Sequence, residues 1–229
     1  AALDKPTVLV LLNGSALAVK WANARIPAIL EAWYTGQRAG TAIADALFGD
    51  YNPGGRLPVT FYKSAADLPP FHEYTMAGRT YRYFTGEPLY PFGHGLSYTT
   101  FDYTEFKMPE KVRAGEEVSV QVTVKNTGAR AGDEVVQLYV RDEQAPVPVP
   151  LRSLAGFRRL HLQPGESRRI SFLITPRQLS LITDEGERIV EPGWFTVTIG
   201  GKQPGFSGSA DNPGTTVVQT RVEITGEPA

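Results

Sequence analysis

The pattern of apolar and polar residues changes near residue 90, and the two parts of the chain predict different kinds of structure. The first part opens with a continuous apolar run at residues 7–12, which ends at Asn13 and Gly14. A short apolar run bounded by turn residues is typical of a strand that is buried on both faces, as in a parallel sheet.

Helix-like and strand-like stretches then alternate. Residues 16–23 and the alanine-rich residues 37–48 are predicted helices. Residues 27–34 and 57–62 are predicted strands, the second at a sheet edge because Pro58 has no N–H group to donate. The order β-α-β-α-β predicts right-handed parallel units of a three-layer α/β sandwich. Because three strands and two helices cannot cover both faces of a sheet, we expect this sandwich to be incomplete, with its missing strands upstream.

The second part has the pattern of an all-β domain. Residues 116–125 read E-E-V-S-V-Q-V-T-V-K, a strict alternation that predicts a half-buried strand. Similar short segments separated by turn residues lie at residues 134–141, 154–162, 167–174, 179–182, 188–191, 194–199 and 216–224. Seven or eight such strands predict a β-sandwich of the immunoglobulin or fibronectin type III kind.

The two parts are joined by L-Y-P-F-G-H-G-L-S-Y-T-T-F at residues 89–101. Pro91, Gly93 and Gly95 oppose a regular helix or strand, while the aromatic residues are too apolar for a free linker. We therefore expect a hinge packed between two domains, with an ordinary surface loop as the alternative. The predicted domains are residues 1–88 (α/β) and 101–229 (β-sandwich), with the hinge at residues 89–100.

Composition narrows the function classes. The chain has 229 residues, a net charge of −1 and no cysteine, so neither a basic nucleic-acid surface nor a thiolate metal site is expected. The sequence contains no apolar run of the ~20 residues that a membrane-spanning helix needs. The chain starts with Ala1 rather than Met, and residues 1–6 resemble the end of a helix, which predicts a piece of a longer protein.

Local motifs for catalysis are missing from the first part. Asn13-Gly14-Ser15 lacks the flanking glycines of a nucleophile elbow, and the histidines do not form a metal-binding pattern with carboxylates. Asp50 is expected to cap a turn and to pair with Arg56. Other carboxylates are Asp45, Asp67 and Glu73. The sequence therefore predicts no catalytic residue, metal or cofactor in this chain.

Residues 71–84, F-H-E-Y-T-M-A-G-R-T-Y-R-Y-F, are the most suggestive stretch for binding. Sugars combine apolar ring faces with hydroxyl groups, so aromatic rings and charged donors suit them. Arg79 and Tyr81 are the predicted substrate-binding residues. The alternative is that these side chains lock a domain interface, where Arg and Tyr are also common anchors.

Several segments together resemble family-3 glycoside hydrolases, the family of β-glucosidases and β-xylosidases. These are V-L-V-L-L-N-G-S-A-L-A, A-I-L-E-A-W-Y-T-G-Q, L-F-G-D-Y-N-P-G-G-R-L-P-V-T-F and P-F-G-H-G-L-S-Y-T-T-F in the first part and hinge, and E-P-G-W-F-T-V-T-I-G in the second. The resemblance implies the end of the family's α/β sandwich domain followed by its fibronectin type III-like domain.

The resemblance also implies a function. Members hydrolyse terminal non-reducing β-linked sugars with retention, which requires two carboxyl groups ~5–5.5 Å apart. In this family the nucleophile lies on an N-terminal (β/α) barrel, and the acid/base of the β-glucosidase branch lies before residue 7. We therefore expect part of a β-glucosidase that is inactive without a companion chain carrying the barrel. A β-xylosidase, or a non-catalytic carbohydrate-binding or adhesion module, is the alternative.

The expected ligand is an oligosaccharide or aryl β-glycoside, without nucleic acid or membrane partners, and the expected location is periplasmic or secreted. Homo-oligomerisation of the full enzyme stays open.

Overall fold

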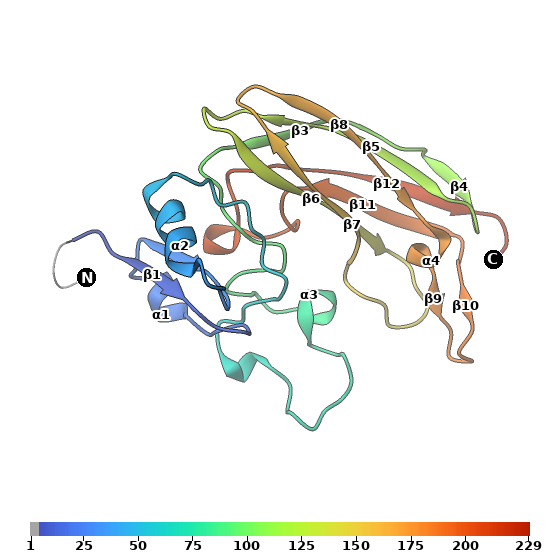
Figure 1. The fold of residues 1–229 in the computed structure, drawn as a ribbon. Helices are drawn as coiled ribbons and strands as arrows, with labels where there is room; N and C mark the ends of the chain where they lie inside the picture. Colours follow the sequence, from blue (N-terminus) through green and yellow to red (C-terminus); the bar gives the residue numbers. More distant parts are fainter. Residues whose placement is uncertain (1–4) are drawn as a thin grey trace.

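The computed structural model describes residues 5–229, so most of the expected helix end at residues 1–6 lies outside the described residues. The chain folds into an α/β part (residues 5–88) and a β-sandwich (residues 101–229), which residues 89–100 connect (Figure 1). No helix in the described residues has the length and apolar character needed to cross a membrane.

The α/β part is built on two parallel strands. β1 (Val8–Leu11) pairs with β2 (Ala28–Glu31) in a register that sets Val8 against Ala28 and Leu11 against Glu31. The helix α1 (Lys20–Asn23) lies between them in sequence, and α2 (Ala39–Phe48) follows β2. Gly49 ends α2 in the left-handed conformation with φ of 86°, which costs glycine little.

Two predicted elements of this part are wrong. The helix expected at residues 16–23 is reduced to α1, whose N-cap residue Val19 has no side-chain acceptor for the first-turn N–H groups. The strand expected at residues 57–62 is absent. Leu57 donates its N–H to His94 O at 2.8 Å and Phe61 to Tyr90 O at 2.9 Å, so this extended segment pairs with residues 89–100 instead of joining β1 and β2.

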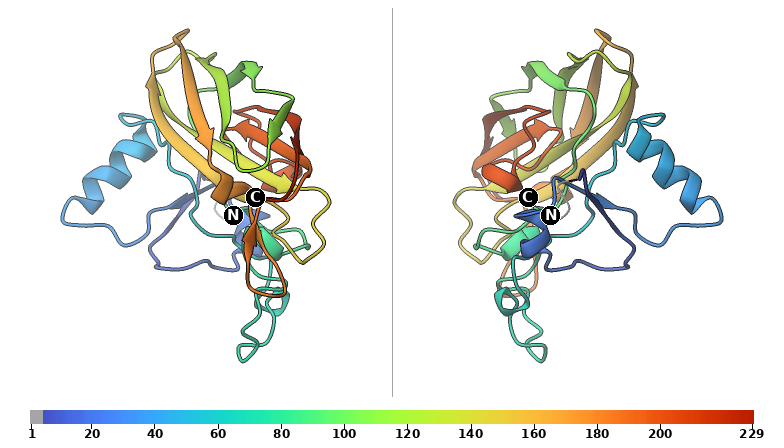
Figure 2. Two further views of the ribbon diagram at one scale, coloured as in Figure 1. Left: turned by 90° about the vertical axis from the view of Figure 1, so that its right-hand side faces the viewer. Right: turned by 90° about the vertical axis from the view of Figure 1, so that its left-hand side faces the viewer.

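Residues 63–84 form a loop that projects away from the rest of the molecule, called here the projecting loop (Figure 2). It contains the short 3₁₀ helix η1 (Ala65–Asp67) and ends in the helix α3 (Thr80–Tyr83). Ser64 and Asp67 form a capping box at η1, with the Ser64 N–H donating to the Asp67 carboxylate at 2.9 Å.

The second part is a sandwich of two sheets. One sheet has the order β3-β5-β8, formed by Phe101–Lys107, Val118–Asn126 and Ser167–Ile174. The other has the order β4-β12-β11-β6-β7, formed by Lys111–Arg113, Val217–Thr225, Gly193–Gly200, Gly132–Asp142 and Ser153–Leu162. Smaller elements are the helix α4 (Pro176–Leu179), the hairpin of β9 (Leu181–Ile182) and β10 (Arg188–Ile189), and the 3₁₀ helix η2 (Gly208–Ala210).

The core of the molecule lies between these two sheets. The alternation in β5 is realised as predicted, with Val118, Val120, Val122 and Val124 all fully buried. Burial of a valine or leucine side chain stabilises a fold by about 1.5–3 kcal/mol, so this continuous core accounts for most of the packing. The strand expected at residues 179–182 is only partly formed, because Pro176 and the Thr175–Gln178 capping box start α4 just before it.

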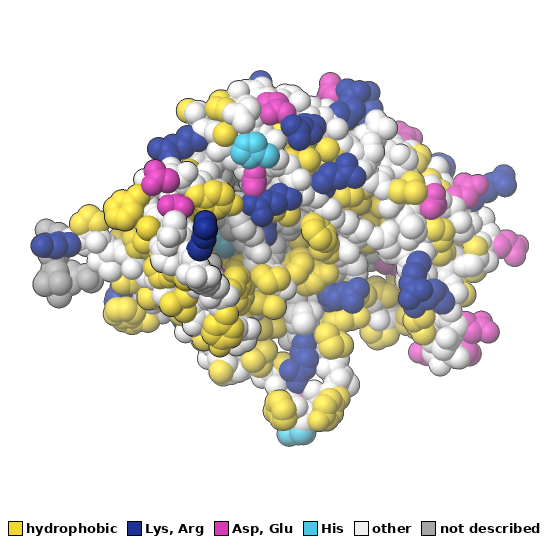
Figure 3. Space-filling view, viewed as in Figure 1, with side chains coloured by type: hydrophobic (Ala, Val, Ile, Leu, Met, Phe, Trp, Pro, Cys, Tyr) yellow, Lys and Arg dark blue, Asp and Glu magenta, His cyan; other side chains and the backbone are white. Residues whose placement is uncertain are grey.

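The α/β part leaves much apolar surface exposed. Hydrophobic side chains gather over it in the space-filling view (Figure 3), and Trp21, Tyr34 and Phe48 are 63%, 81% and 85% exposed. At the carboxyl ends of β1 and β2, Asn13 Oδ1 and Glu31 Oε2 are buried without a donor in the described residues. Burial also raises the pKa of the Glu31 carboxyl.

Candidate functional site at the junction of the two parts

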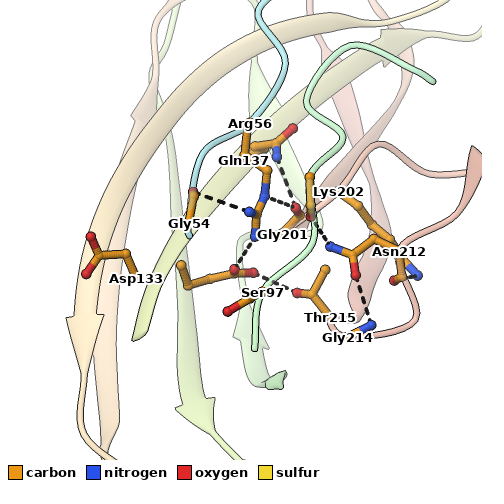
Figure 4. A network of polar contacts seen from close by, with 12 residues as sticks. Gly54, Arg56, Ser97, Asp133, Gln137, Gly201, Lys202, Asn212, Gly214 and Thr215 are labelled. Atoms are coloured by element: carbon orange, nitrogen blue, oxygen red, sulfur yellow. Dashed lines mark hydrogen bonds and ion pairs between the residues drawn. The ribbon is translucent and has the colours of Figure 1, made fainter. Parts of the chain in front are cut away.

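The two parts meet around an ion pair between Arg56 and Glu134. Arg56 follows the turn after α2, and Glu134 stands near the start of β6. The Arg56 Nη2 to Glu134 Oε2 distance is 2.6 Å, and the two side chains are 6% and 0% exposed. This pair joins residues 78 positions apart in sequence, one on each side of the junction (Figure 4).

Further hydrogen bonds complete the surroundings of this pair. Glu134 Oε1 accepts from Tyr103 Oη at 2.8 Å and from Thr215 Oγ1 at 2.6 Å. Arg56 also donates to the carbonyls of Gly201 at 3.2 Å and Gly55 at 3.1 Å. A buried ion pair is tolerated when its remaining donors and acceptors are satisfied in this way. These contacts make it a clamp between the two parts.

The electrostatics of Glu134 follow from its burial. Removal from water raises the pKa of its carboxyl, and the Arg56 charge with the two hydroxyl donors opposes that shift. Burial and the adjacent Glu134 charge raise the pKa of Tyr103 well above its ordinary value. The expected pairing of Asp50 with Arg56 is wrong, because the nearby carboxylate of Arg56 is Glu134. Sequence reasoning missed Glu134, although an acidic residue at an inward-facing position of a predicted strand was a visible signal.

Side chains of the β-sandwich bind the backbone of residues 89–100. Gln137 Nε2 donates to Gly93 O at 3.0 Å, Gln203 Nε2 to Phe92 O at 3.1 Å, and Asn212 Nδ2 to Gly95 O at 2.6 Å. Leu89 and His94 in this segment are 2% and 9% exposed. Residues 89–100 are therefore held from the sandwich side by side-chain amides.

Two glycines allow the close approach at the junction. Gly93 has φ of +79°, and a Cβ atom there would lie 2.1 Å from Gln137 Oε1. A Cβ atom on Gly201 would lie 1.7 Å from Glu134 Oε1. Any larger residue at Gly201 would therefore displace the carboxylate from its partners.

His94 lies in the same region. Its ring stacks on Tyr90 with centroids 5.1 Å apart, and Tyr90 Oη donates to Asn23 Oδ1 at 2.6 Å. His94 Nδ1 is buried without a partner in the part of the chain that the structure describes. Burial and then the Arg56 charge lower the pKa of His94 to about 4, against smaller opposing contributions from Asp211 and the Ala210 carbonyl.

Arg79 stabilises the projecting loop. Its Nη2 donates to the carbonyls of Pro70 at 3.0 Å and Glu73 at 2.7 Å, which closes the tip of the loop. At this tip Phe71 and Tyr74 are 93% and 89% exposed. Arg79 thus presents two aromatic rings to whatever surrounds the loop.

Tyr81 lies between the two parts instead of at the loop tip. Its ring stacks on Phe92 with centroids 4.3 Å apart at 16°, and its edge meets Tyr139. The Tyr81 hydroxyl accepts the N–H of Leu154 at 3.1 Å. The structure therefore does not bring Arg79 and Tyr81 into one constellation, and a substrate-binding role for either stays a prediction.

A groove of about 290 Å³ opens beside Tyr81, and it is called here the junction groove. It lies where α3 meets the loop before β7, and Leu151 N donates to Arg82 O at 2.6 Å at this place. Its lining comes from both parts of the chain: Thr60, Tyr81, Phe84, Thr85, Gly86, Glu87, Pro88, Pro91, Phe92, Leu151, Arg152, Gln203, Gly205 and Phe206. Among residues 5–229, no group of three or more His, Asp or Glu is arranged to hold a metal ion.

Comparison with known proteins shows the family. Residues 1–98 match the glycosyl hydrolase family 3 C-terminal domain, and residues 134–203 match the fibronectin type III-like domain. The chain belongs to glycosyl hydrolase family 3. It is similar to the C-terminal part of these enzymes, which confirms the predicted combination of an α/β domain with a fibronectin type III-like sandwich.

Similar sequences include both glucosidases and xylosidases. A xylan 1,4-β-xylosidase of Xylanibacter ruminicola is 44% identical over 87% of this chain and 23% of the relative. A β-xylosidase of Formosa agariphila is 42% identical over 86% of this chain and 28% of the relative. A periplasmic β-glucosidase of Salmonella typhimurium is 42% identical over 87% of this chain and 28% of the relative. The chain thus spans about a quarter of the length of these relatives.

The fold agrees with solved structures of the family. β-Glucosidase 3B of Thermotoga neapolitana in complex with glucose superposes with a TM-score of 0.85 at 31% identity, covering 100% of this chain and 32% of that one. A β-glucosidase of Erythrobacter marinus superposes with a TM-score of 0.82 at 37% identity, covering 98% and 29%. The arrangement of both parts about the junction is therefore a family arrangement.

Proposed function

We propose that this chain is the C-terminal part of a retaining, exo-acting β-glycosidase, most directly a β-glucosidase that removes terminal non-reducing β-D-glucosyl residues. The observation that carries the proposal is the superposition of nearly the whole chain, both parts together, on two β-glucosidases. In this proposal the chain completes the α/β sandwich, forms part of the cleft wall and carries the fibronectin type III-like domain.

The catalytic carboxylates are assigned to a companion portion that contains the (β/α) barrel. Retaining hydrolysis needs two carboxyl groups ~5–5.5 Å apart on either side of one bond. Glu134 is occupied by Arg56, Tyr103 and Thr215, and Asp67 caps η1, so neither is available for that task. The exposed apolar side chains of the α/β part support a companion that covers them.

The buried acceptors at the ends of β1 and β2 also support a companion. A buried carboxylate or amide oxygen without a donor costs about 1–3 kcal/mol, so Glu31 Oε2 and Asn13 Oδ1 call for donors from further protein. We assign the limits 1–88, 89–100 and 101–229 to the incomplete α/β domain, the hinge and the fibronectin type III-like domain. Limited proteolysis of the intact protein should cut the projecting loop before residues 89–100.

The test is hydrolysis of an aryl β-glucoside. The assembly of this chain with its barrel-bearing portion should release the aryl group with retention, while this chain alone should be inert. Activity of the isolated chain above background would overturn the assignment of roles. A companion is detected most simply by the intact mass of the natural protein, which should be three to four times that of this chain if the lengths of the relatives apply.

A β-xylosidase is the second candidate, because two of the similar sequences are named as β-xylosidases at 42% and 44% identity. The ratio of kcat/KM for an aryl β-glucoside and the matching aryl β-xyloside decides between the two. A non-catalytic carbohydrate-binding or adhesion role is the remaining alternative, and it requires sugar binding without hydrolysis by the intact protein. We also propose a periplasmic or secreted location, which the named periplasmic relative supports and cell fractionation tests.

A further inference from the structure

Arg152 lies in the junction groove without an acidic partner. Its Nη1 donates to Gln203 Oε1 at 2.6 Å, and its guanidinium carbon lies 5.6 Å from the centre of the Phe206 ring. Arginine carries five N–H donors, so most of its capacity is unused by these contacts. Within residues 5–229, no carboxylate lies within ion-pair distance of Arg152.

The neighbouring charges favour an anion at this place. Burial lowers the pKa of the Arg152 guanidinium, and the charge of Arg141 lowers it further, with an opposing effect from Tyr139. Glu87 at the edge of the groove is already paired with Lys63. Arg82 on α3 adds a second guanidinium close by, where its Nη2 donates to Ser153 Oγ at 3.2 Å. A cation that is partly removed from water gains from a counter-ion.

The walls of the groove suit a sugar ring. Its volume of about 290 Å³ is near the lower limit of small-molecule pockets, which is the size of a single saccharide unit. Phe84 and Phe206 offer apolar surface for a ring face, and Thr85 offers a hydroxyl group to sugar hydroxyls. Gln203 holds Arg152 in position, because its Nε2 is fixed by Phe92 O and its Oε1 accepts from Arg152.

We propose that the junction groove binds an acidic saccharide, with the carboxylate of a uronate residue on Arg152 and its ring against Phe206. Arginine is the side chain best matched to a carboxylate, because its planar donors accept both oxygens at once. The site would hold an acidic branch or end of a glycan while hydrolysis takes place elsewhere, so it goes beyond the proposed glycosidase activity.

The test compares two sugars that differ in one group. Methyl β-D-glucuronide and methyl β-D-glucoside are titrated by calorimetry at low salt into the intact protein that carries this chain. The glucuronide should bind ~10-fold more tightly, the effect of a charge-assisted pair. Arg152→Gln should abolish this preference. Arg158→Gln is the matched control, because Arg158 also lies 5.6 Å over a phenylalanine ring, that of Phe172, but outside the groove; it should leave the preference intact.

Other outcomes overturn the proposal. Equal affinity for both sugars, or an unchanged preference in Arg152→Gln, removes the role of the guanidinium. Acetate or sulfate that binds as tightly as the glucuronide indicates a small-anion site without sugar recognition. Competitive inhibition of aryl glycoside hydrolysis by the glucuronide indicates binding in the catalytic cleft. If Arg152→Gln fails to fold in thermal unfolding, Phe206→Ala decides, because it must weaken glucuronide binding with Arg152 still present.

Discussion

The guanidinium of Arg56 and the carboxylate of Glu134 meet at 2.6 Å across the junction, and both side chains are almost completely shielded from solvent. A buried charge that loses its partner is destabilising by about 3–5 kcal/mol. Either Arg56→Met or Glu134→Leu should therefore lower the unfolding temperature of the intact protein by on the order of 10 °C.

The double variant Arg56→Met/Glu134→Leu is the informative control for this prediction. It removes both charges, so it should recover much of the stability lost in each single variant. If the two single losses simply add in the double variant, the pair is not a coupled unit. Arg169→Gln, at an exposed pair with Glu105, should leave the unfolding temperature unchanged.

Gly201→Ala tests the close approach at the same clamp. The added Cβ atom would lie 1.7 Å from Glu134 Oε1, so the carboxylate must move away from Thr215 and Tyr103. We expect a loss of about 1–3 kcal/mol in chemical denaturation, the usual cost of overpacking. Gly40→Ala is the matched control, because it stands in α2 with nothing near the new Cβ atom and should be neutral or stabilising. Equal stability of the two variants would contradict the prediction.

His94 should make the protein less stable in mild acid. Its pKa is about 4 in the folded protein and near 6.5 unfolded, so the folded state disfavours the charged ring. The full stability is therefore present above pH 6.5, and it declines as the pH falls from 6.5 to 4, by roughly 3 kcal/mol in total. Denaturation midpoints at pH 7, 5.5 and 4.5 measure this decline.

The variant His94→Phe keeps an aromatic ring on Tyr90 and removes the titrating group. It should flatten the pH dependence between 6.5 and 4.5. A variant with the same slope as the natural protein would assign the decline to other groups.

Arg79 and Tyr81 separate substrate binding from structure. In the assembled enzyme, Arg79→Ala is expected to lower kcat/KM by ~10-fold or more, if a charge-assisted hydrogen bond to substrate is lost. Unchanged kinetics with a lower unfolding temperature would instead support its bonds to Pro70 and Glu73 as its whole role. Tyr81→Phe removes only the acceptor for Leu154 N–H, so it should cost about 1 kcal/mol of stability.

The β-sandwich should fold alone, and the α/β part should not. Residues 101–229 contain the continuous core, so this fragment should give a strand-type circular dichroism spectrum and a cooperative transition. In isolation its Glu134 loses Arg56, so Glu134→Gln should stabilise this fragment while it destabilises the intact protein. Residues 5–90 alone should aggregate, because their apolar surface is uncovered. A soluble, cooperatively folding fragment 5–90 would contradict this expectation.

Periodicity predicted the elements whose side chains pack by a regular pattern. The valines of β5 and the end of α2 at Gly49 follow from local signals. Residues 101–107 gave no clear alternation because β3 changes register after Thr104, where Glu105 has φ of 52°. The path of residues 57–62 is decided by distant carbonyls in residues 89–100, which no local window contains.

The same limit applies to the candidate site. Arg79 and Tyr81 stand close in sequence but lie on different features, one bracing the loop tip and the other packed on Phe92. Arg152 and Phe206 lie far apart in sequence and meet only through the fold. Their relation therefore had no sequence signal.

The amide contacts from Gln137, Gln203 and Asn212 to residues 89–100 have a consequence for protein engineering. A chimera that exchanges the fibronectin type III-like domain at residue 100 would keep the recipient's residues 55–56 and 89–95 but replace the side chains that hold them. Such an exchange should succeed only when the donor domain brings a glutamate and three amides at equivalent positions. The transplantable unit is therefore the whole of residues 52–229, and a linker is a poor place to cut.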